Sequence, residues 1–200
     1  SQTIFRMVEN IHPQKSAQAK YVVQTLGGMG DPSVQTHATQ LTTRLARLTG
    51  AEPKLLPVPG LTTSREAKLL MLADPFVRET MDLFGSISLA IVGIGAVEPS
   101  ELLARSGNIF STRELADLAE AGAVGDISLR FFDKTGKPVK TPLDERVIGL
   151  PLEDLSKVER VIALAGGQKK TEAIGGALLT GVIDTLITDR FTAERLLANS

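Results

Sequence analysis

Two lysines follow a glycine pair in residues 161–174, VIALAGGQKKTEAI, and this stretch has the residue types best suited to chemistry. Five apolar residues precede Gly166 and Gly167, and an apolar pattern of helical spacing begins after Lys170. A strand that turns into a helix beside cations suits an anion such as phosphate, because free amides and the helix dipole point at the same place. The pattern is also compatible with a catalytic lysine or with a solvated turn. The stretch alone leaves these three interpretations open.

Two further polar positions, Thr3 and Asp126, bear on this choice beside the two lysines. Lys170 lies at the expected helix start, where a cation is unfavourable unless an anionic partner is present, whereas Lys169 is expected at the surface. Thr3 can cap the first helix or place its hydroxyl on a phosphate. Asp126 can accept hydrogen bonds from sugar hydroxyls or serve as a turn residue.

Glycines recur where strands are expected to end, and the carboxyl ends of strands are where open α/β sheets bind ligands. Glycine also lets a backbone approach a ligand closely. The run GGMG lacks the spacing GxGxxG, and no strand precedes a GxxxxGK[ST] loop, so neither nucleotide-binding motif is supported. We expect an anion-binding crevice that involves Gly27, Gly28, Gly93, Gly95, Gly166 and Gly167.

Composition excludes several classes of protein. The formal net charge of −1 gives no basic footprint for nucleic acid. The chain has no Cys and only two His, His12 and His37, so disulfides are excluded and we expect no metal site and no cofactor. No apolar run is long enough for a spanning helix and no signal peptide is visible, so we expect a cytoplasmic protein that does not contact a membrane.

Strands and amphipathic helices alternate along most of the chain, which predicts an α/β fold: a Rossmann-like, mostly parallel sheet with helices on both faces and an inserted β-hairpin. We expect one domain over residues 1–200. Residues 2–10 form a helical pattern with no strand before it, so we also expect that a first strand is missing. The expected strands are 21–26, 87–94, 127–132, 161–165 and 184–188, with a turn at 133–136. The expected helices are 2–10, 32–50, 75–85, 111–122, 170–181 and one from about 192.

Several strings taken together resemble the effector-binding domain of SorC-type and DeoR-type bacterial transcriptional regulators. The strings are VVQTLGGMG, GIGAVEPSELL, GAVGDISLRFFDKTGKPV, RVIGLPLEDL, VIALAGGQKKTEAI and IDTLITDRFTAERLL. The resemblance implies a fold like that of sugar-phosphate isomerases and CoA transferases, which binds a phosphorylated sugar without turning it over. It also implies a homo-oligomer, dimer or tetramer, that holds operator DNA only through a helix-turn-helix domain absent from this chain.

The resemblance carries over to particular positions. It implies that Thr3 at the first helix start and Lys170 meet the phosphate, and that Asp126 binds sugar hydroxyls. Family members that bind a phosphate or an aldehyde beside GG carry Arg or Lys where this chain has Leu26. A second phosphate or a Schiff base is therefore not expected at that position.

Two alternatives to a regulatory sensor remain. An isomerase-type or lactonase-type enzyme on this fold needs a general base near the sugar, and Asp126, with Glu172 as a weaker candidate, lacks a convergent partner. A module that has lost its ligand and only oligomerises is the other. We expect the sensor, not an enzyme.

Overall fold

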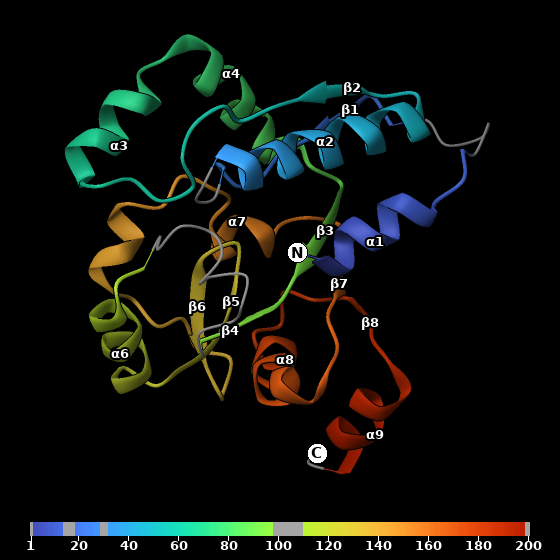
Figure 1. Ribbon diagram of the computed structural model, residues 1–200, viewed down its shortest axis with the longest axis vertical. Helices are drawn as coiled ribbons and strands as arrows, with labels where there is room; N and C mark the ends of the chain where they lie inside the picture. Colours follow the sequence, from blue (N-terminus) through green and yellow to red (C-terminus); the bar gives the residue numbers. More distant parts are fainter. Residues whose placement is uncertain (1, 14–18, 29–31, 98–109, 199–200) are drawn as a thin grey trace.

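The computed structural model alternates strands and helices as the sequence predicts, and it describes residues 2–13, 19–28, 32–97 and 110–198 (Figure 1). The strands are β1 Tyr21–Val23, β2 Glu52–Lys54, β3 Leu89–Gly93, β4 Gly95–Ala96, β5 Ala123–Ile127, β6 Arg130–Asp133, β7 Arg160–Leu164 and β8 Thr185–Ile187. The α-helices are α1 Gln2–Asn10, α2 Pro32–Thr49, α3 Arg65–Leu72, α4 Pro75–Asp82, α6 Thr112–Glu120, α7 Leu152–Leu155, α8 Thr171–Leu179 and α9 Arg190–Ala198. Short 3-10 helices are η1 Leu83–Ser86, η2 Pro142–Glu145 and η3 Gln168–Lys170.

Parallel pairing dominates the sheet that carries the strand ends of interest. The strands run in the order β3-β7-β8, and every neighbouring pair is parallel. The pair β1-β2 is also parallel, with α2 as its crossover. α1 packs against β3, while α8 contacts β5 and β6, so helices lie around the sheets as a doubly wound fold requires (Figure 1).

The antiparallel part, β4-β5-β6, corrects one expectation. Residues 127–132 are not one strand: the chain reverses at Ser128 and Leu129, which have φ values of 53° and 62°, and β5 pairs with β6 across this turn. Two central residues with positive φ make the tight turn that matches strand twist. The expected turn at 133–136 also exists, since the Asp133 N–H donates to the Lys137 carbonyl over 2.9 Å.

Helix signals in the sequence are mostly confirmed. The Ser111 side chain accepts from the Glu114 N–H as a capping box, and Asp74 caps α4 ahead of Pro75. Gly50 has a φ of 68°, as expected directly after α2. Helix α3 was not expected, although Ser64 caps it by accepting from the Ala67 N–H.

Two apolar clusters form the core. The larger joins the parallel strands to α8 and includes Val92, Val161, Ala163 and Ile174. The smaller lies around the antiparallel strands and α6, and within it the rings of Phe110 and Phe131 meet edge to face at a centroid distance of 6.0 Å. The larger cluster includes Val92 and Ile94 at the end of β3, and the smaller includes Ala123 at the start of β5.

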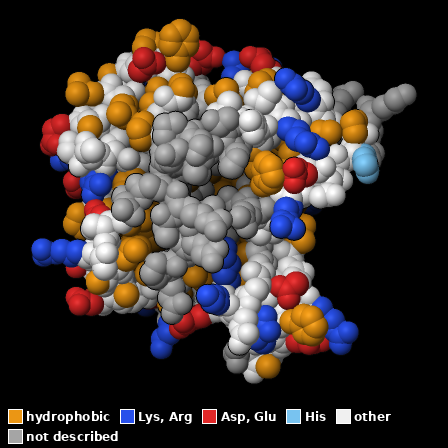
Figure 2. Space-filling model, viewed as in Figure 1, with side chains coloured by type: hydrophobic (Ala, Val, Ile, Leu, Met, Phe, Trp, Pro, Cys, Tyr) orange, Lys and Arg blue, Asp and Glu red, His pale blue; other side chains and the backbone are white. Residues whose placement is uncertain are grey.

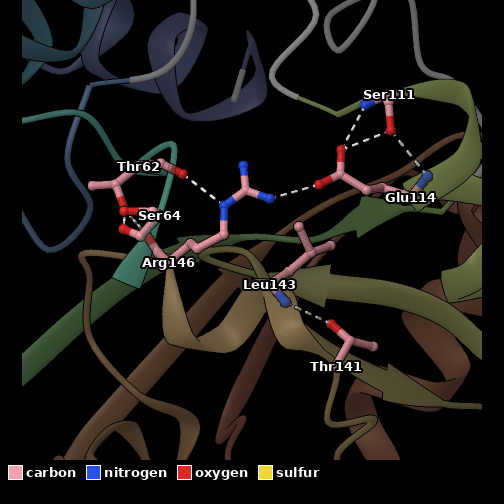
Figure 3. A network of polar contacts seen from close by, with 7 residues as sticks. All are labelled: Thr62, Ser64, Ser111, Glu114, Thr141, Leu143 and Arg146. Carbon is pink, nitrogen blue, oxygen red and sulfur yellow. Dashed lines mark hydrogen bonds and ion pairs between the residues drawn. The ribbon is translucent and has the colours of Figure 1, made fainter. Parts of the chain in front are cut away.

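A polar network fastens α6 to the connections around it (Figure 3). The Arg146 Nη1 donates to Glu114 Oε1 over 2.7 Å, and Arg146 Nε donates to the Thr62 carbonyl over 2.7 Å. The other carboxylate oxygen of Glu114 accepts from the N–H and the hydroxyl of Ser111. These bonds join the start of α6 to the loop before α3 and to the end of η2, so we assign the network a role in the fold.

Candidate functional site

Three parallel strands end at one edge of the sheet, and the chain after each strand contributes to that edge. β3 is followed by Ile94 and Gly95, β7 by residues 165–170, and β8 by Thr188 and Asp189. Gly93, the last residue of β3, pairs with Leu164, the last residue of β7. This is the edge at which open α/β sheets bind ligands.

Lys170 reaches across this edge. Its half-buried side chain donates from Nζ to the Ile94 carbonyl over 2.7 Å, so the end of η3 is tied to the end of β3. Burial lowers the pKa of Lys170, while the negative charge of Asp126 acts in the opposite direction. Lys169 is exposed, as expected. Lys170 is therefore a partly desolvated cation at the edge. One N–H of its ammonium group donates to the Ile94 carbonyl, and an ammonium group has further N–H donors that can bind a ligand.

Asp126 lies close enough to Lys170 for their charges to interact. Burial raises the pKa of Asp126 above its ordinary value. Two smaller effects oppose this rise: the hydrogen bond of 2.9 Å from the Leu129 N–H to Oδ2, and the positive charge of Lys170. The carboxylate thus holds the tight turn at Ser128 and Leu129 in addition to facing the edge. Oδ1 does not take part in that bond.

Glycine is required opposite Asp126. Gly95 pairs with Asp126 between β4 and β5, and a Cβ on Gly95 would collide with Asp126 Oδ1. On the other side of the ladder a Cβ on Gly125 would lie 2.8 Å from the Ala173 methyl of α8. These two glycines bring the carboxylate and α8 close to the strand end.

The glycine pair after β7 has two different requirements. Gly167 has a φ of 104°, a conformation that strongly favours glycine. A Cβ on Gly166 would lie 2.5 Å from Asp189 Oδ2, so the side chain of Asp189 fills the space beside it. The Gly167 N–H donates to Asp189 Oδ2 over 3.0 Å and to Thr192 Oγ1 over 2.9 Å.

Gly27 and Gly28 lie on a different connection. Their N–H groups donate to the carbonyls of Ile148 and Val58, and a Cβ on Gly27 would meet the backbone of Gly60. The preceding Leu26 packs with its Cδ1 against Gly60 and Gly149. The described contacts therefore join this glycine pair to neighbouring loops, and none of them reaches Lys170 or Asp126.

Thr3 is exposed in the first turn of α1. α1 packs against β3 and begins near the carboxyl end of that strand, on the same side as the edge described above (Figure 1).

Other polar candidates do not gather into a second centre. Glu172 and His12 are exposed, and the side chain of His37 lies outside the described residues. Across residues 2–13, 19–28, 32–97 and 110–198 no group of three or more His, Cys, Asp or Glu is placed to hold a metal ion. In the same ranges no helix is long and apolar enough to cross a membrane. Figure 2 shows basic and acidic side chains mixed on one face of the molecule.

Sequence reasoning missed two of the residues that shape the edge. Asp189 and Thr192 both bond to Gly167, yet the expected last helix was placed from about Thr192 onward. The sequence carried a signal for the helix cap, because Asp189 directly follows a strand and Asp is a preferred N-cap residue, but it carried none for the bonds to Gly167.

A family model described as "Putative sugar-binding domain" matches residues 2–198. The chain belongs to this family of sugar-binding domains. It is 34% identical over 199 residues to the transcriptional regulator YjhU of Escherichia coli K12, and this match covers 98% of the chain and 59% of that protein. It is 32% identical over 194 residues to the deoxyribonucleoside regulator of Bacillus subtilis, and this match covers 97% of the chain and 61% of that protein. The sugar-binding domain described here thus spans about three-fifths of the length of these regulators.

Solved structures agree. The full-length sorbitol operon regulator SorC of Klebsiella pneumoniae superposes with a TM-score of 0.88 at 27% identity, covering 98% of this chain and 63% of that one. A domain of a possible sugar-binding transcriptional regulator of Arthrobacter aurescens gives a TM-score of 0.85 at 27% identity, over 97% of this chain and 74% of that one. The predicted fold class and the resemblance to SorC-type and DeoR-type regulators are confirmed. The relatives are transcriptional regulators with sugar-binding domains and not enzymes.

Proposed function

We propose that this sugar-binding domain senses a phosphorylated sugar at the carboxyl ends of β3 and β7, and that occupancy changes how an oligomeric regulator holds operator DNA. The observation that carries the proposal is the Lys170 ammonium, held 2.7 Å from the Ile94 carbonyl and within electrostatic reach of Asp126. A cation and a carboxylate together at a strand-end edge suit a ligand that has both a phosphate and hydroxyls.

The two ends of such a ligand meet different groups. In this proposal the phosphate meets the Lys170 ammonium, which carries the positive charge at the strand-end edge. Thr3, in the first turn of α1, supplies a hydroxyl beside the same strand end. Asp126 Oδ1 accepts from a sugar hydroxyl, while Oδ2 remains bonded to the Leu129 N–H.

The three glycine pairs have different roles in this proposal. Gly93 ends β3 at the edge where the ligand is proposed to bind, and Gly95 leaves room there for the Asp126 carboxylate. Gly166 and Gly167 give the loop after β7 its shape. Gly27 and Gly28 keep the connection after β1 closely packed on residues 58–60, and any contact of theirs with the ligand would be separate from Lys170. Operator DNA is held by a part of the regulator other than residues 1–200.

The arrangement supports binding rather than turnover. Isomerisation requires a base and an acid that converge on the reacting carbons. Asp126 is the one carboxylate that the described residues bring to Lys170, and Glu172 is exposed.

A melting-temperature panel tests the proposal. Hexose and pentose phosphates and the corresponding free sugars are added to the protein, and product formation is assayed in the same samples. We expect at least one phosphorylated sugar to raise the melting temperature by mass action, its free sugar to have little effect, and no product to form. Turnover, or equal effects of the phosphorylated and free sugars, contradicts the proposal.

Two variants locate the site. Lys170→Met should weaken binding of the active phosphorylated sugar by roughly tenfold to a hundredfold, because a charge-assisted hydrogen bond is lost. Lys169→Met is the matched control, since its side chain is exposed on the same short helix, and its affinity should stay within about twofold of wild type. Equal affinities of the two variants would contradict the proposal that Lys170 binds the phosphate.

A further inference from the structure

The carboxylate of Asp189 and the hydroxyl of Thr192 connect α9 to the loop that carries Lys170. Asp189 Oδ2 accepts from the Gly167 N–H over 3.0 Å and from the Thr192 hydroxyl over 2.6 Å. Asp189 Oδ1 accepts from the Thr192 N–H over 2.9 Å and so caps α9. The Thr192 hydroxyl and the backbone N–H groups lower the pKa of Asp189 to about 2, so the carboxylate is ionised at neutral pH.

Thr192 is the centre of this arrangement. Its side chain is fully buried, and its hydroxyl oxygen accepts from the Gly167 N–H over 2.9 Å and from Arg195 Nη2 over 3.1 Å. Arg195 Nε in turn donates to the Thr171 hydroxyl, over 3.2 Å, at the start of α8. A buried polar side chain with all of its partners present fixes the segments that it joins.

The same contacts explain why the motif has two glycines. Asp189 takes the space that a side chain at Gly166 would need, and Gly167 adopts a φ of 104° that turns its N–H toward Asp189 and Thr192. The Gly167 amide is therefore already occupied and faces an ionised carboxylate. An anion at this loop therefore has to be held by a charge further along, at Lys170.

We propose that Asp189 and Thr192 are positioning residues, which hold the segment 166–170 in the shape that presents Lys170 to the ligand. The inference rests on the proposed function, because the ligand is the phosphorylated sugar sensed at that edge. Asp189 and Thr192 do not touch the ligand themselves. Removing the hydroxyl of Thr192 leaves the Lys170 side chain unchanged, but it removes a hydrogen bond that holds the loop on which Lys170 lies.

The test compares Thr192→Val, which has the same shape without the hydroxyl, with Thr192→Ser, which keeps it. The first readout is the Gly167 amide proton in the ligand-free protein, followed by NMR. The second is the dissociation constant for glucose 6-phosphate and ribose 5-phosphate. Thr185→Val, at an exposed position of β8, is the control and should change neither readout.

We expect the Gly167 amide proton to move upfield in Thr192→Val because a hydrogen-bond acceptor is lost, and the affinity for the phosphorylated sugar to fall by about tenfold, the equivalent of one charge-assisted hydrogen bond. Thr192→Ser should restore both. Asp189→Asn, which keeps the size of the side chain, should shift the same amide proton and serves if Thr192→Val does not fold.

Two results overturn the inference. One is an unmoved Gly167 amide in both Thr192→Val and Asp189→Asn, which would mean that the bonds do not shape the loop. The other is a shifted amide with wild-type affinity, which would mean that the shape does not matter to the ligand. Wild-type protein that binds no phosphorylated sugar of the melting-temperature panel contradicts the proposed function instead, and the amide readout still decides whether Asp189 and Thr192 shape the loop.

Discussion

Asp126 illustrates how one residue serves the fold and the candidate site together. Its Oδ2 holds the turn between β5 and β6 through the Leu129 N–H, and its charge interacts with Lys170. Sequence reasoning identified Asp126 and Lys170 from the motifs that contain them, but not the dependence of Asp126 on Gly95. That dependence is a packing contact between strands, which the order of residues in a chain does not reveal.

Substituting Gly95 by Ala tests this dependence. The new methyl group would collide with Asp126 Oδ1, so the carboxylate must rotate and the Leu129 N–H loses its acceptor. We expect the free energy of unfolding to fall by about 2 kcal/mol, as measured by urea denaturation, because a buried donor is left without a partner. Gly85→Ala is the control, since a Cβ there meets nothing within 4 Å, and its unfolding free energy should be close to wild type. A Gly95→Ala protein as stable as the control would contradict the contact.

At the scale of the element, the most informative departure from expectation is the turn between β5 and β6. Helices α2, α4 and α6 were predicted because prolines, capping side chains and terminal glycines mark their ends in the sequence. Ser128 and Leu129 carry no such mark, since a two-residue turn with positive φ at both positions ordinarily contains Asn, Asp or Gly. Leu129 is buried in the smaller core cluster, so packing and the Asp126 carboxylate impose the turn that local preference does not.

The strain at this turn predicts a stabilising substitution. Ser128→Asn should raise the free energy of unfolding by about 0.5 kcal/mol, because Asn adopts positive φ at lower cost. Urea denaturation measures the difference, with Ser88→Asn as a control at an exposed residue outside the positive-φ set. Stabilisation of both variants alike, or of neither, would show that the backbone at Ser128 is not the cause.

At the scale of the whole molecule, the candidate site is assembled from segments that are distant in sequence: residues 94–95, 126, 166–170 and 189–192. The sequence predicted that strand ends meet, because parallel strands share an edge, and the family resemblance assigned ligand roles to Thr3, Lys170 and Asp126. The support from α9 could not be predicted, since it depends on how β8 and α9 pack beside the loop after β7. The two glycine pairs also differ in a way that the sequence does not show, with Gly27 and Gly28 bonded to residues 148 and 58.

The most direct test of the account follows backbone amide signals by NMR while the phosphorylated sugar that stabilises the protein most is added. We predict that the largest changes fall on residues 166–170, with further changes at Gly95 and Asp126, and that the free sugar produces far smaller ones. Changes centred elsewhere, for example on the apolar groove between α3 and α4 lined by Leu70, Met71 and Phe76, would contradict the account.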